Sequence, residues 1–285
     1  MEGPENVTDV VLRAMSHTPD PRLRAIMESL VRHLHAFLRE VKLTPEEFEA
    51  AVDFLVRLGK ASGPAKNEVI LASDLLGAST LVMMLDAQAS GGASTDAALL
   101  GPFFRANAPA MPDGADIARD AGGGAPLLMR GRVRDAAGNP VAGAAVEVWQ
   151  ASPVGLYENQ DPRQPKHNLR GRFQTDAAGR FEFRSVKPAG YPVPIDGPCG
   201  ELLRAQHRHP YRPAHIHYMI VKPGYKTLIT QVFDNADDAI ESDVVFGVTP
   251  ALSGRFQPQA GGTYLLEYDF VMQPGESRVP RAPIP

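Results

Sequence analysis

Cysteine is almost absent from this chain of 285 residues, which contains only Cys199. A single cysteine excludes a disulfide within the chain, and it also excludes a metal site built from several thiolates. The chain has no surplus of positive charge either, because its formal net charge is −4 at pH 7. A general electrostatic attraction to nucleic acid is therefore not expected.

Long apolar runs are missing as well. No stretch reaches the 18 or more apolar residues that a membrane-spanning helix needs, so we expect no membrane span. The acidic start MEGPENVTDV lacks the basic and apolar regions of a signal peptide. We therefore expect a cytoplasmic protein. Its length and its hydrophobic content of 44% are ordinary for a globular chain of one or two domains.

The first 90 or so residues have the pattern of helices. In TPEE, Thr44 is placed as an N-cap, Pro45 as the first helical residue and Glu47 as the partner in a capping box. This helix should stop near Gly63. A second helix is predicted from about residue 67 to 87, and its apolar residues cover more than one face. Such a helix can pack against its own chain and against a second subunit.

A segment rich in Gly, Pro and Ala follows at 90–126, after which the hydrophobic pattern changes to a period of two. That alternation predicts short strands separated by turns. Many short strands with Gly and Pro turns are typical of a β-sandwich. The expected fold is mainly β with an α-helical N-terminal region. The predicted strands lie within 129–151, 171–186, 214–221, 227–233 and 263–272.

The segment RPAHIH carries the first candidate functional residues. Alternate residues of a strand point to the same face, so His215 and His217 share one face of a predicted strand. Taken alone, such a pair can equally lie on a solvated face. His207 and His209 have the same spacing but lie in the polar segment QHRHPYR, which is typical of a turn. His215 and His217 instead open the apolar run IHYMIV, so they should be buried and need partners.

Two loops contain one tyrosine each, Tyr157 in GLYENQDP and Tyr191 in GYPVPIDGP. A lone tyrosine in a loop is more often structural than functional. Two phenols and two imidazoles together would form a site with four ligands, two of them anionic oxygens. Such a donor set suits a hard trivalent cation, of which ferric iron is the obvious candidate. A free phenol has a pKa of about 10, but a strongly charged metal removes its proton at neutral pH.

The two tyrosine segments, together with RPAHIHYMI, LITQVF and LLGPFF, resemble the intradiol ring-cleavage dioxygenases, which are non-haem Fe(III) enzymes. The resemblance implies a helical dimerisation and linker domain at 1–100 and a β-sandwich catalytic domain at 101–285. It implies a homodimer formed through the N-terminal helices, with a lipid held between them. It also implies Tyr157, Tyr191, His215 and His217 as the iron ligands, and Tyr191, Arg212 and Gln231 as catalytic residues.

Enzymes of this family share the iron site but open different rings. Those that cleave protocatechuate usually lack the helical preface. Leu71 and Asp74 share a face of the predicted helix, in a stretch that resembles the pocket helix of the family. Hydroxyquinol-cleaving members carry an aspartate there, and ESDVVFGV also resembles them, with Val245 near the ring. The resemblance implies further pocket walls at Gly101, Pro102, Phe103, Val193 and Pro194.

The expected reaction is thus the opening of hydroxyquinol by O₂ to 3-hydroxy-cis,cis-muconate, the enol form of maleylacetate. A catechol or chlorocatechol 1,2-dioxygenase is the alternative, with Asp74 as a residue of the helix surface. A more remote alternative is a non-enzymatic module, because GRVRDAAGNPVAGAAVEVW also resembles carboxypeptidase-regulatory-like sandwiches. That alternative leaves Tyr157 and Tyr191 unexplained, and it does not account for the helical preface.

Overall fold

The structure is a computed structural model that describes residues 3–63, 66–89 and 94–284. By its internal contacts the chain forms two compact units, Met1–Val56 and Arg57–Pro285. This division lies well before the boundary that we predicted near residue 100. The helices that immediately precede the connector therefore belong to the same unit as the strands. The predicted division of roles between 1–100 and 101–285 stays a prediction.

In the described part of the chain, three α-helices precede residue 62. They are α1 (Val7–Met15), which follows a short 3₁₀ helix η1 (Pro4–Asn6), then α2 (Pro21–Glu40) and α3 (Pro45–Ala61). The Glu47 side chain accepts a hydrogen bond from the Thr44 N–H at 2.8 Å, and Thr44 Oγ1 accepts one from the Glu47 N–H at 3.3 Å. The predicted capping box is confirmed.

The single helix predicted from 67 to 87 is wrong in one respect, because the structure breaks it into α4 (Glu68–Leu75) and α5 (Ala78–Ala89). Gly77 lies between them with a φ of 71°, and its N–H donates to the Asp74 carbonyl at 2.9 Å. A glycine in this left-handed conformation ends a helix without steric penalty. Within the described residues no single helix is long and apolar enough to span a membrane, and α4 and α5 reach that length only together, across a bend of 69°.

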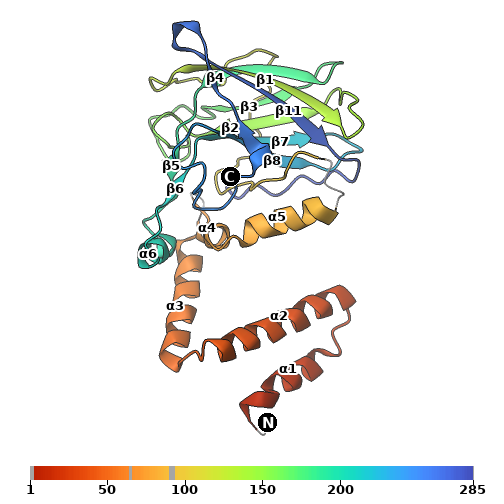
Figure 1. Cartoon of the computed structure of the whole chain (residues 1–285), viewed down its shortest axis with the longest axis vertical. Coiled ribbons are helices and arrows are strands. Elements are labelled where there is room, and N and C mark those ends of the chain that lie inside the picture. The colour runs from red at the N-terminus through yellow and green to blue at the C-terminus, as the bar shows by residue number, and fades with distance from the viewer. Residues whose placement is uncertain (1–2, 64–65, 90–93, 285) are drawn as a thin grey trace. The chain divides into compact units, whose positions relative to one another are not determined.

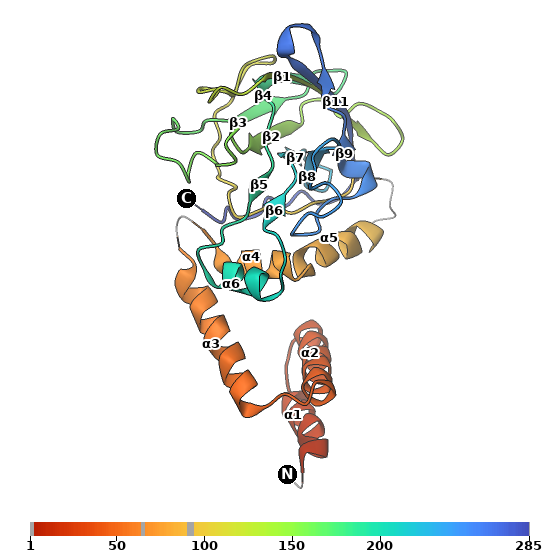
Figure 2. The same cartoon turned by 60° about the vertical axis from the view of Figure 1, so that its left-hand side comes forward.

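The strands form two main sheets, ordered β10-β11-β1-β4 and β3-β2-β7-β8-β9, and a third small sheet pairs β5 with β6. Figures 1 and 2 show the two larger sheets as stacked layers, which confirms the predicted β-sandwich. The unit Arg57–Pro285 also contains the helix α6 (Pro198–Ala205) and the 3₁₀ helices η2 (Pro250–Leu252) and η3 (Ala260–Gly262). The strands are β1 (Pro126–Asp135), β2 (Ala145–Gln150), β3 (Arg170–Gln174), β4 (Arg180–Val186), β5 (Tyr191–Pro192), β6 (Tyr211–Arg212), β7 (His215–Val221), β8 (Leu228–Asp234), β9 (Ser253–Gly254), β10 (Gln257–Pro258) and β11 (Tyr264–Met272).

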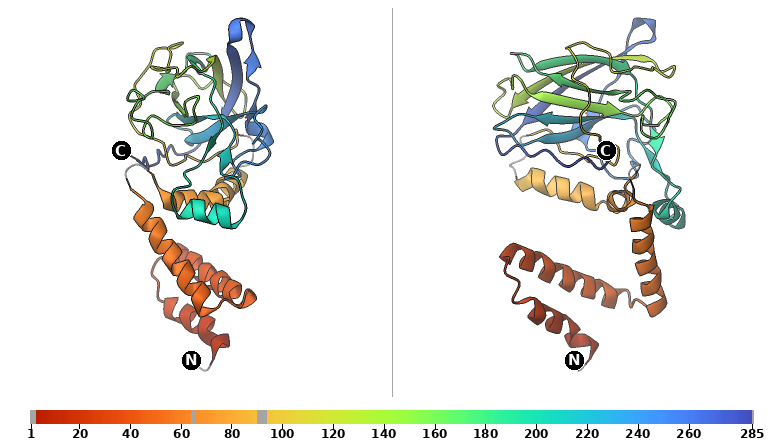
Figure 3. Two further views of the ribbon diagram at one scale, coloured as in Figure 1. Left: turned by 90° about the vertical axis from the view of Figure 1, so that its left-hand side faces the viewer. Right: turned by 180° about the vertical axis from the view of Figure 1, so that it is seen from behind.

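Strand β7 is buried on both of its faces. Its even-numbered residues Ile216, Tyr218 and Ile220 belong to the apolar core that contains residues of both sheets. Met219 belongs to a second cluster, with Trp149 and aromatic residues from the loops. Because side chains alternate along a strand, His215 and His217 share the face of Met219. In Figures 1 and 3, α4 and α5 lie along the side of the sandwich where β7 and β8 run. The fold thus covers the face of the sheet that carries the histidines.

Candidate functional site

The register of three neighbouring strands fixes the two histidines. His217 on β7 pairs with Trp149 on β2 and with Gln231 on β8, and His215 pairs with Phe233 on β8. The Trp149 ring stacks on the His217 ring, with centroids 4.8 Å apart and an interplanar angle of 11°. Both imidazoles are buried. His217 has a paired strand on each side, whereas His215 pairs with β8.

Two tyrosines complete the cluster from outside the sheet. Tyr157 comes from the loop between β2 and β3, and Tyr191 from β5, and their phenol oxygens lie 3.2 Å apart. Ring centroids are 5.6 Å apart for Tyr157 and Tyr191, 5.5 Å for Tyr191 and His215, 4.7 Å for the two histidines, and 6.2 Å for His217 and Tyr157. These four residues, called the four-ring cluster below, therefore form a closed circuit of contacts.

The donor atoms of the four-ring cluster have the spacing of ligands around one ion. His215 Nδ1 lies 2.7 Å from the Pro213 carbonyl, which can only accept, so Nδ1 carries the proton and Nε2 carries a lone pair that here faces Arg212 Nη1 and could bind a metal instead. The two Nε2 atoms are 3.1 Å apart. Two ligand atoms that each bind one ion at about 2 Å lie roughly 3 Å apart. The nitrogen pair and the oxygen pair both fit this spacing.

A metal site here depends on the tyrosines. In the described part of the chain, no three His, Cys, Asp or Glu side chains gather into a group that could hold a metal ion. Burial raises the pKa of Tyr157 and Tyr191, lowers the pKa of His215 to about 3, and lowers that of His217 well below its usual value. All four shifts favour the uncharged forms. Only a strongly charged cation would draw off the phenol protons and give two anionic ligands.

Arg212 lies against the four-ring cluster and joins several of its neighbours. Its Nε and Nη2 donate to the two Asp243 carboxylate oxygens at 3.0 and 3.1 Å, and Nη2 also donates to Gln231 Oε1 at 2.8 Å. Nη1 lies 3.1 Å from His215 Nε2. Burial alone would lower the pKa of Arg212, but the Asp243 carboxylate holds it above the ordinary value. The guanidinium is therefore a fixed, permanently charged group beside the cluster.

A narrow pocket, called the inner pocket below, opens beside the four-ring cluster. Gly101 brings its backbone close to the His217 ring, since a β-carbon there would lie 3.3 Å from His217 Cε1, and its φ of 76° favours glycine. Every residue that the sequence predicted for the substrate pocket lines this space. The lining consists of Leu71, Asp74, Leu99, Gly101, Pro102, Phe103, Tyr191, Val193, Pro194, Arg212, His217 and Val245.

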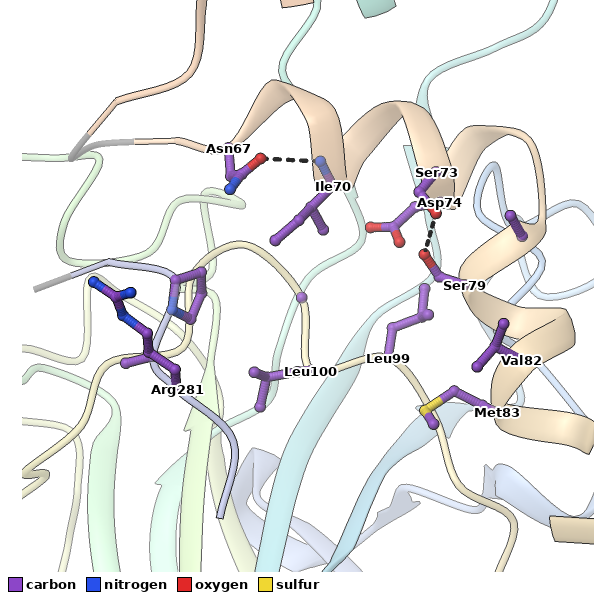
Figure 4. Close-up of a pocket in the computed structure, with 14 residues that line it drawn as sticks. Asn67, Ile70, Ser73, Asp74, Ser79, Val82, Met83, Leu99, Leu100 and Arg281 are labelled. Atoms are coloured by element: carbon purple, nitrogen blue, oxygen red, sulfur yellow. Dashed lines mark hydrogen bonds between the residues drawn. The ribbon is translucent and has the colours of Figure 1, made fainter. Parts of the chain in front are cut away.

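Asp74 is the one carboxylate in the inner pocket. Its side chain is 3% exposed, and burial raises its pKa to about 6, although Ser79 and Arg212 oppose this shift. Asp74 also faces a wider cavity of about 630 Å³, called the outer cavity, which shares Leu99 and Gly101 with the inner pocket. Figure 4 shows the outer cavity between α4, α5 and the segment that carries Arg281. The inner pocket thus adjoins a larger space.

Some residues that build the site were missed by the sequence analysis. Asp243 holds Arg212, and it could have been noticed as the carboxylate two residues before Val245 in an apolar segment. Trp149 is the single tryptophan of the chain. The Leu99 carbonyl accepts from Gln231 Nε2 at 2.7 Å, and nothing in the sequence marked that contact. Tyr157 and His215, predicted as iron ligands, lie in the four-ring cluster and do not line the inner pocket. Gln231, predicted as a catalytic residue, does not line it either but accepts a hydrogen bond from Arg212.

Comparisons with known proteins agree along most of the chain. Residues 99–274 match the family model described as dioxygenase, and residues 20–94 match that of the catechol dioxygenase N terminus. A 6-chlorohydroxyquinol 1,2-dioxygenase of Cupriavidus pinatubonensis is 45% identical, covering 94% of this chain and 97% of its own. A hydroxyquinol 1,2-dioxygenase of a Rhizobium species is 46% identical, covering 89% of this chain and 85% of its own. The crystal structure of hydroxyquinol 1,2-dioxygenase from Pseudomonas putida DLL-E4 is 39% identical, with a TM-score of 0.86 over 95% and 99% of the chains.

The raised pKa of Asp74 predicts how stability depends on pH. Burial raises this pKa from 3.8 to about 6, so the group favours the folded state at low pH, and that contribution is lost as pH rises through about 6. Asp74→Asn cannot ionise. The free energy of unfolding of the variant, relative to the wild type, should rise by roughly 1 to 3 kcal/mol between about pH 4 and pH 7. Urea unfolding of the chelator-treated wild type and variant at several pH values measures this difference in unfolding free energy. A difference that does not change with pH would contradict the prediction.

Proposed function

Because the chain belongs to the intradiol ring-cleavage dioxygenases, we propose that this enzyme opens hydroxyquinol with O₂, giving 3-hydroxy-cis,cis-muconate and hence maleylacetate. One observation carries the choice of substrate. A buried carboxylate, Asp74, lines the inner pocket together with Tyr191, Arg212 and His217. A buried carboxylate needs a hydrogen-bond donor, and the third hydroxyl of hydroxyquinol supplies one. The relatives compared above are named for hydroxyquinol or its 6-chloro derivative, which supports the same choice.

The four-ring cluster is proposed to hold Fe(III) through Tyr157, Tyr191, His215 and His217. The spacing of the two donor pairs supports this assignment. When bound, ferric iron would favour the phenolate forms of the two tyrosines and would make a bound diol ring reactive toward O₂. A set of two phenolates and two imidazoles suits a hard trivalent ion better than Zn²⁺.

The two tyrosines would then have different roles. Tyr191 lines the inner pocket, whereas Tyr157 does not. Tyr191 Oη can therefore accept the proton of an incoming ring hydroxyl, which makes Tyr191 a general base. The buried Arg170 guanidinium lies 5.8 Å from the Tyr157 ring centroid. Tyr157 would remain a ligand throughout.

Arg212 would stabilise negative charge on the substrate, and Gln231 would orient the Arg212 guanidinium. The Arg212 guanidinium lines the inner pocket and is fixed by Asp243, so it can stabilise negative charge that develops on the ring oxygens. Gln231 accepts from Arg212 and donates to the Leu99 carbonyl, which ties the guanidinium to a pocket wall. Both side chains are thus held in place by the protein itself, through Asp243 and the Leu99 carbonyl.

Other assignments are weaker. A catechol or chlorocatechol 1,2-dioxygenase would leave the Asp74 carboxylate without a donor from the ring. The non-enzymatic module is set aside, because the family models match both the helical and the sandwich segments. The expected cytoplasmic location stays a prediction.

The first test concerns the metal. Tyr157→Phe and His217→Ala each remove one of the four proposed ligands, so both should reduce iron retention and the visible colour of phenolate-to-iron charge transfer. Iron analysis and absorption spectra measure this. Tyr218→Phe is the matched control, because Tyr218 is a buried tyrosine on the opposite face of β7. Unchanged iron in both ligand variants would place the metal elsewhere.

The second test concerns the ring. A carboxylate that accepts a hydrogen bond from a buried phenol contributes about 1.5 to 3 kcal/mol, or roughly a 10- to 100-fold preference in kcat/KM. Hydroxyquinol should therefore have a higher kcat/KM than catechol. Asp74→Asn or Asp74→Leu should reduce the ratio of the two kcat/KM values, while the iron content stays the same. Oxygen uptake with both substrates measures the ratio. Asp96→Asn is the control, since Asp96 binds the Thr249 hydroxyl and does not line the inner pocket. A wild type that prefers catechol would return the assignment to catechol 1,2-dioxygenase.

The third test concerns assembly, for which we propose a homodimer through the N-terminal helices. The helix α2 carries a stripe of exposed apolar side chains at helical spacing, namely Leu23, Ile26, Leu30, Leu34, Phe37 and Val41. A second copy would cover such a stripe, and the family resemblance adds a lipid held between these helices. Light scattering should return about twice the 30.7 kDa chain mass, and Leu30→Glu should lower it, whereas Arg32→Glu, an exposed charged position of the same helix, should not. A wild type of 30.7 kDa at micromolar concentration would contradict the dimer.

A further inference from the structure

Arg208 lies between α6 and β6, in the polar turn QHRHPYR, and it does not line the inner pocket. We propose that Arg208 is a positioning residue that fixes two walls of the inner pocket relative to each other and thereby sets the selectivity among ring substituents. This inference rests on the proposed ring-opening function.

The first wall is the helix α4, which carries Leu71 and Asp74. Arg208 Nη1 donates to the Leu75 carbonyl at 2.9 Å, at the last residue of α4. The final carbonyls of a helix have no partner within the helix, and a cation at that end is electrostatically favourable. Leu75 follows Asp74 directly, so this bond holds the end of α4 from which Asp74 projects.

The second wall is the segment that contains Val245. Arg208 Nη2 donates to the Val244 carbonyl at 2.7 Å, and the guanidinium lies 5.0 Å from the Phe246 ring centroid. Asp243, which holds Arg212, is the preceding residue in the same segment. The Thr80 hydroxyl of α5 donates to the Val245 carbonyl at 3.0 Å, which gives this wall a second, independent link to the helical side.

The guanidinium is suited to this task because its donors have a fixed planar geometry. One rigid group binds carbonyls on both walls, so the spacing of those carbonyls cannot change without loss of a hydrogen bond. A lysine ammonium has its donors on one nitrogen and lacks the fixed spacing of the two guanidinium nitrogens. Differences of one methylene in an apolar pocket change discrimination by about 10- to 200-fold. A small shift of one wall should therefore change selectivity by roughly 3- to 10-fold.

The experiment uses the iron-loaded enzyme and compares kcat/KM for hydroxyquinol, catechol and 4-chlorocatechol. Arg208→Lys and Arg208→Gln should each change the ratios between substrates by at least about threefold. Iron content and colour should stay as in the wild type, because Arg208 contacts no proposed ligand. Arg184→Gln is the matched control: it removes an arginine-to-carbonyl bond, from Nη1 to Gly114 O at 2.7 Å, at a position that does not line the inner pocket.

Equal loss of activity on all three substrates, with unchanged ratios, would mean that Arg208 only stabilises the fold, and would overturn the proposal. If the Arg208 variants do not fold, Thr80→Val provides the test, because it releases the same wall, the Val245 segment. Altered kcat/KM ratios between the three substrates in Thr80→Val would support the proposal, and unchanged ratios would overturn it. A wild type that prefers catechol would refute the proposed substrate. The Arg208 comparison would still hold, because it depends on changes in the ratios and not on which ring is preferred.

Discussion

The site depends on a buried ion pair between Arg212 and Asp243. The two residues come from β6 and from the segment before Val245, and both side chains are almost fully buried. Leaving either charge alone in this environment would cost several kcal/mol, so the pair holds the two segments together. Through Gln231 the same guanidinium is tied to β8, and it also lies beside His215. One side chain thereby links the sheet, the inner pocket and the proposed metal ligands.

This ion pair explains how a β-sandwich with an ordinary apolar core can carry reactive groups on the sheet face that points away from that core. The sheet fixes the histidines by register, and the segments that cover them supply the tyrosines and the pocket walls. The break at Gly77 turns α5 away from α4, so that a short helix can present Leu71 and Asp74 to the inner pocket while α5 borders the outer cavity. The geometry therefore places two of the proposed metal ligands, His215 and His217, on the sheet, and two of the proposed substrate contacts, Leu71 and Asp74, on a helix.

The sequence predicted those features that local pattern determines. The capping box at Thr44 and the β-sandwich strands follow from patterns a few residues long, and the structure confirms them. The shared face of His215 and His217 follows from strand alternation alone. The Asp243 partner of Arg212 could not be derived in this way, because it depends on how distant segments pack. The break at Gly77 was missed for another reason: the apolar pattern continues across it, and only the φ angle of the glycine ends the helix.

Four side chains from three separate segments are proposed to bind one iron ion. Anomalous diffraction at the iron absorption edge, from crystals of the iron-loaded protein, would locate that ion. We expect one strong peak within bonding distance of the phenol oxygens of Tyr157 and Tyr191 and of Nε2 of His215 and His217. A fully occupied peak elsewhere in the chain, or one that lacks either tyrosine as a neighbour, would show that these four side chains are not the ligand set.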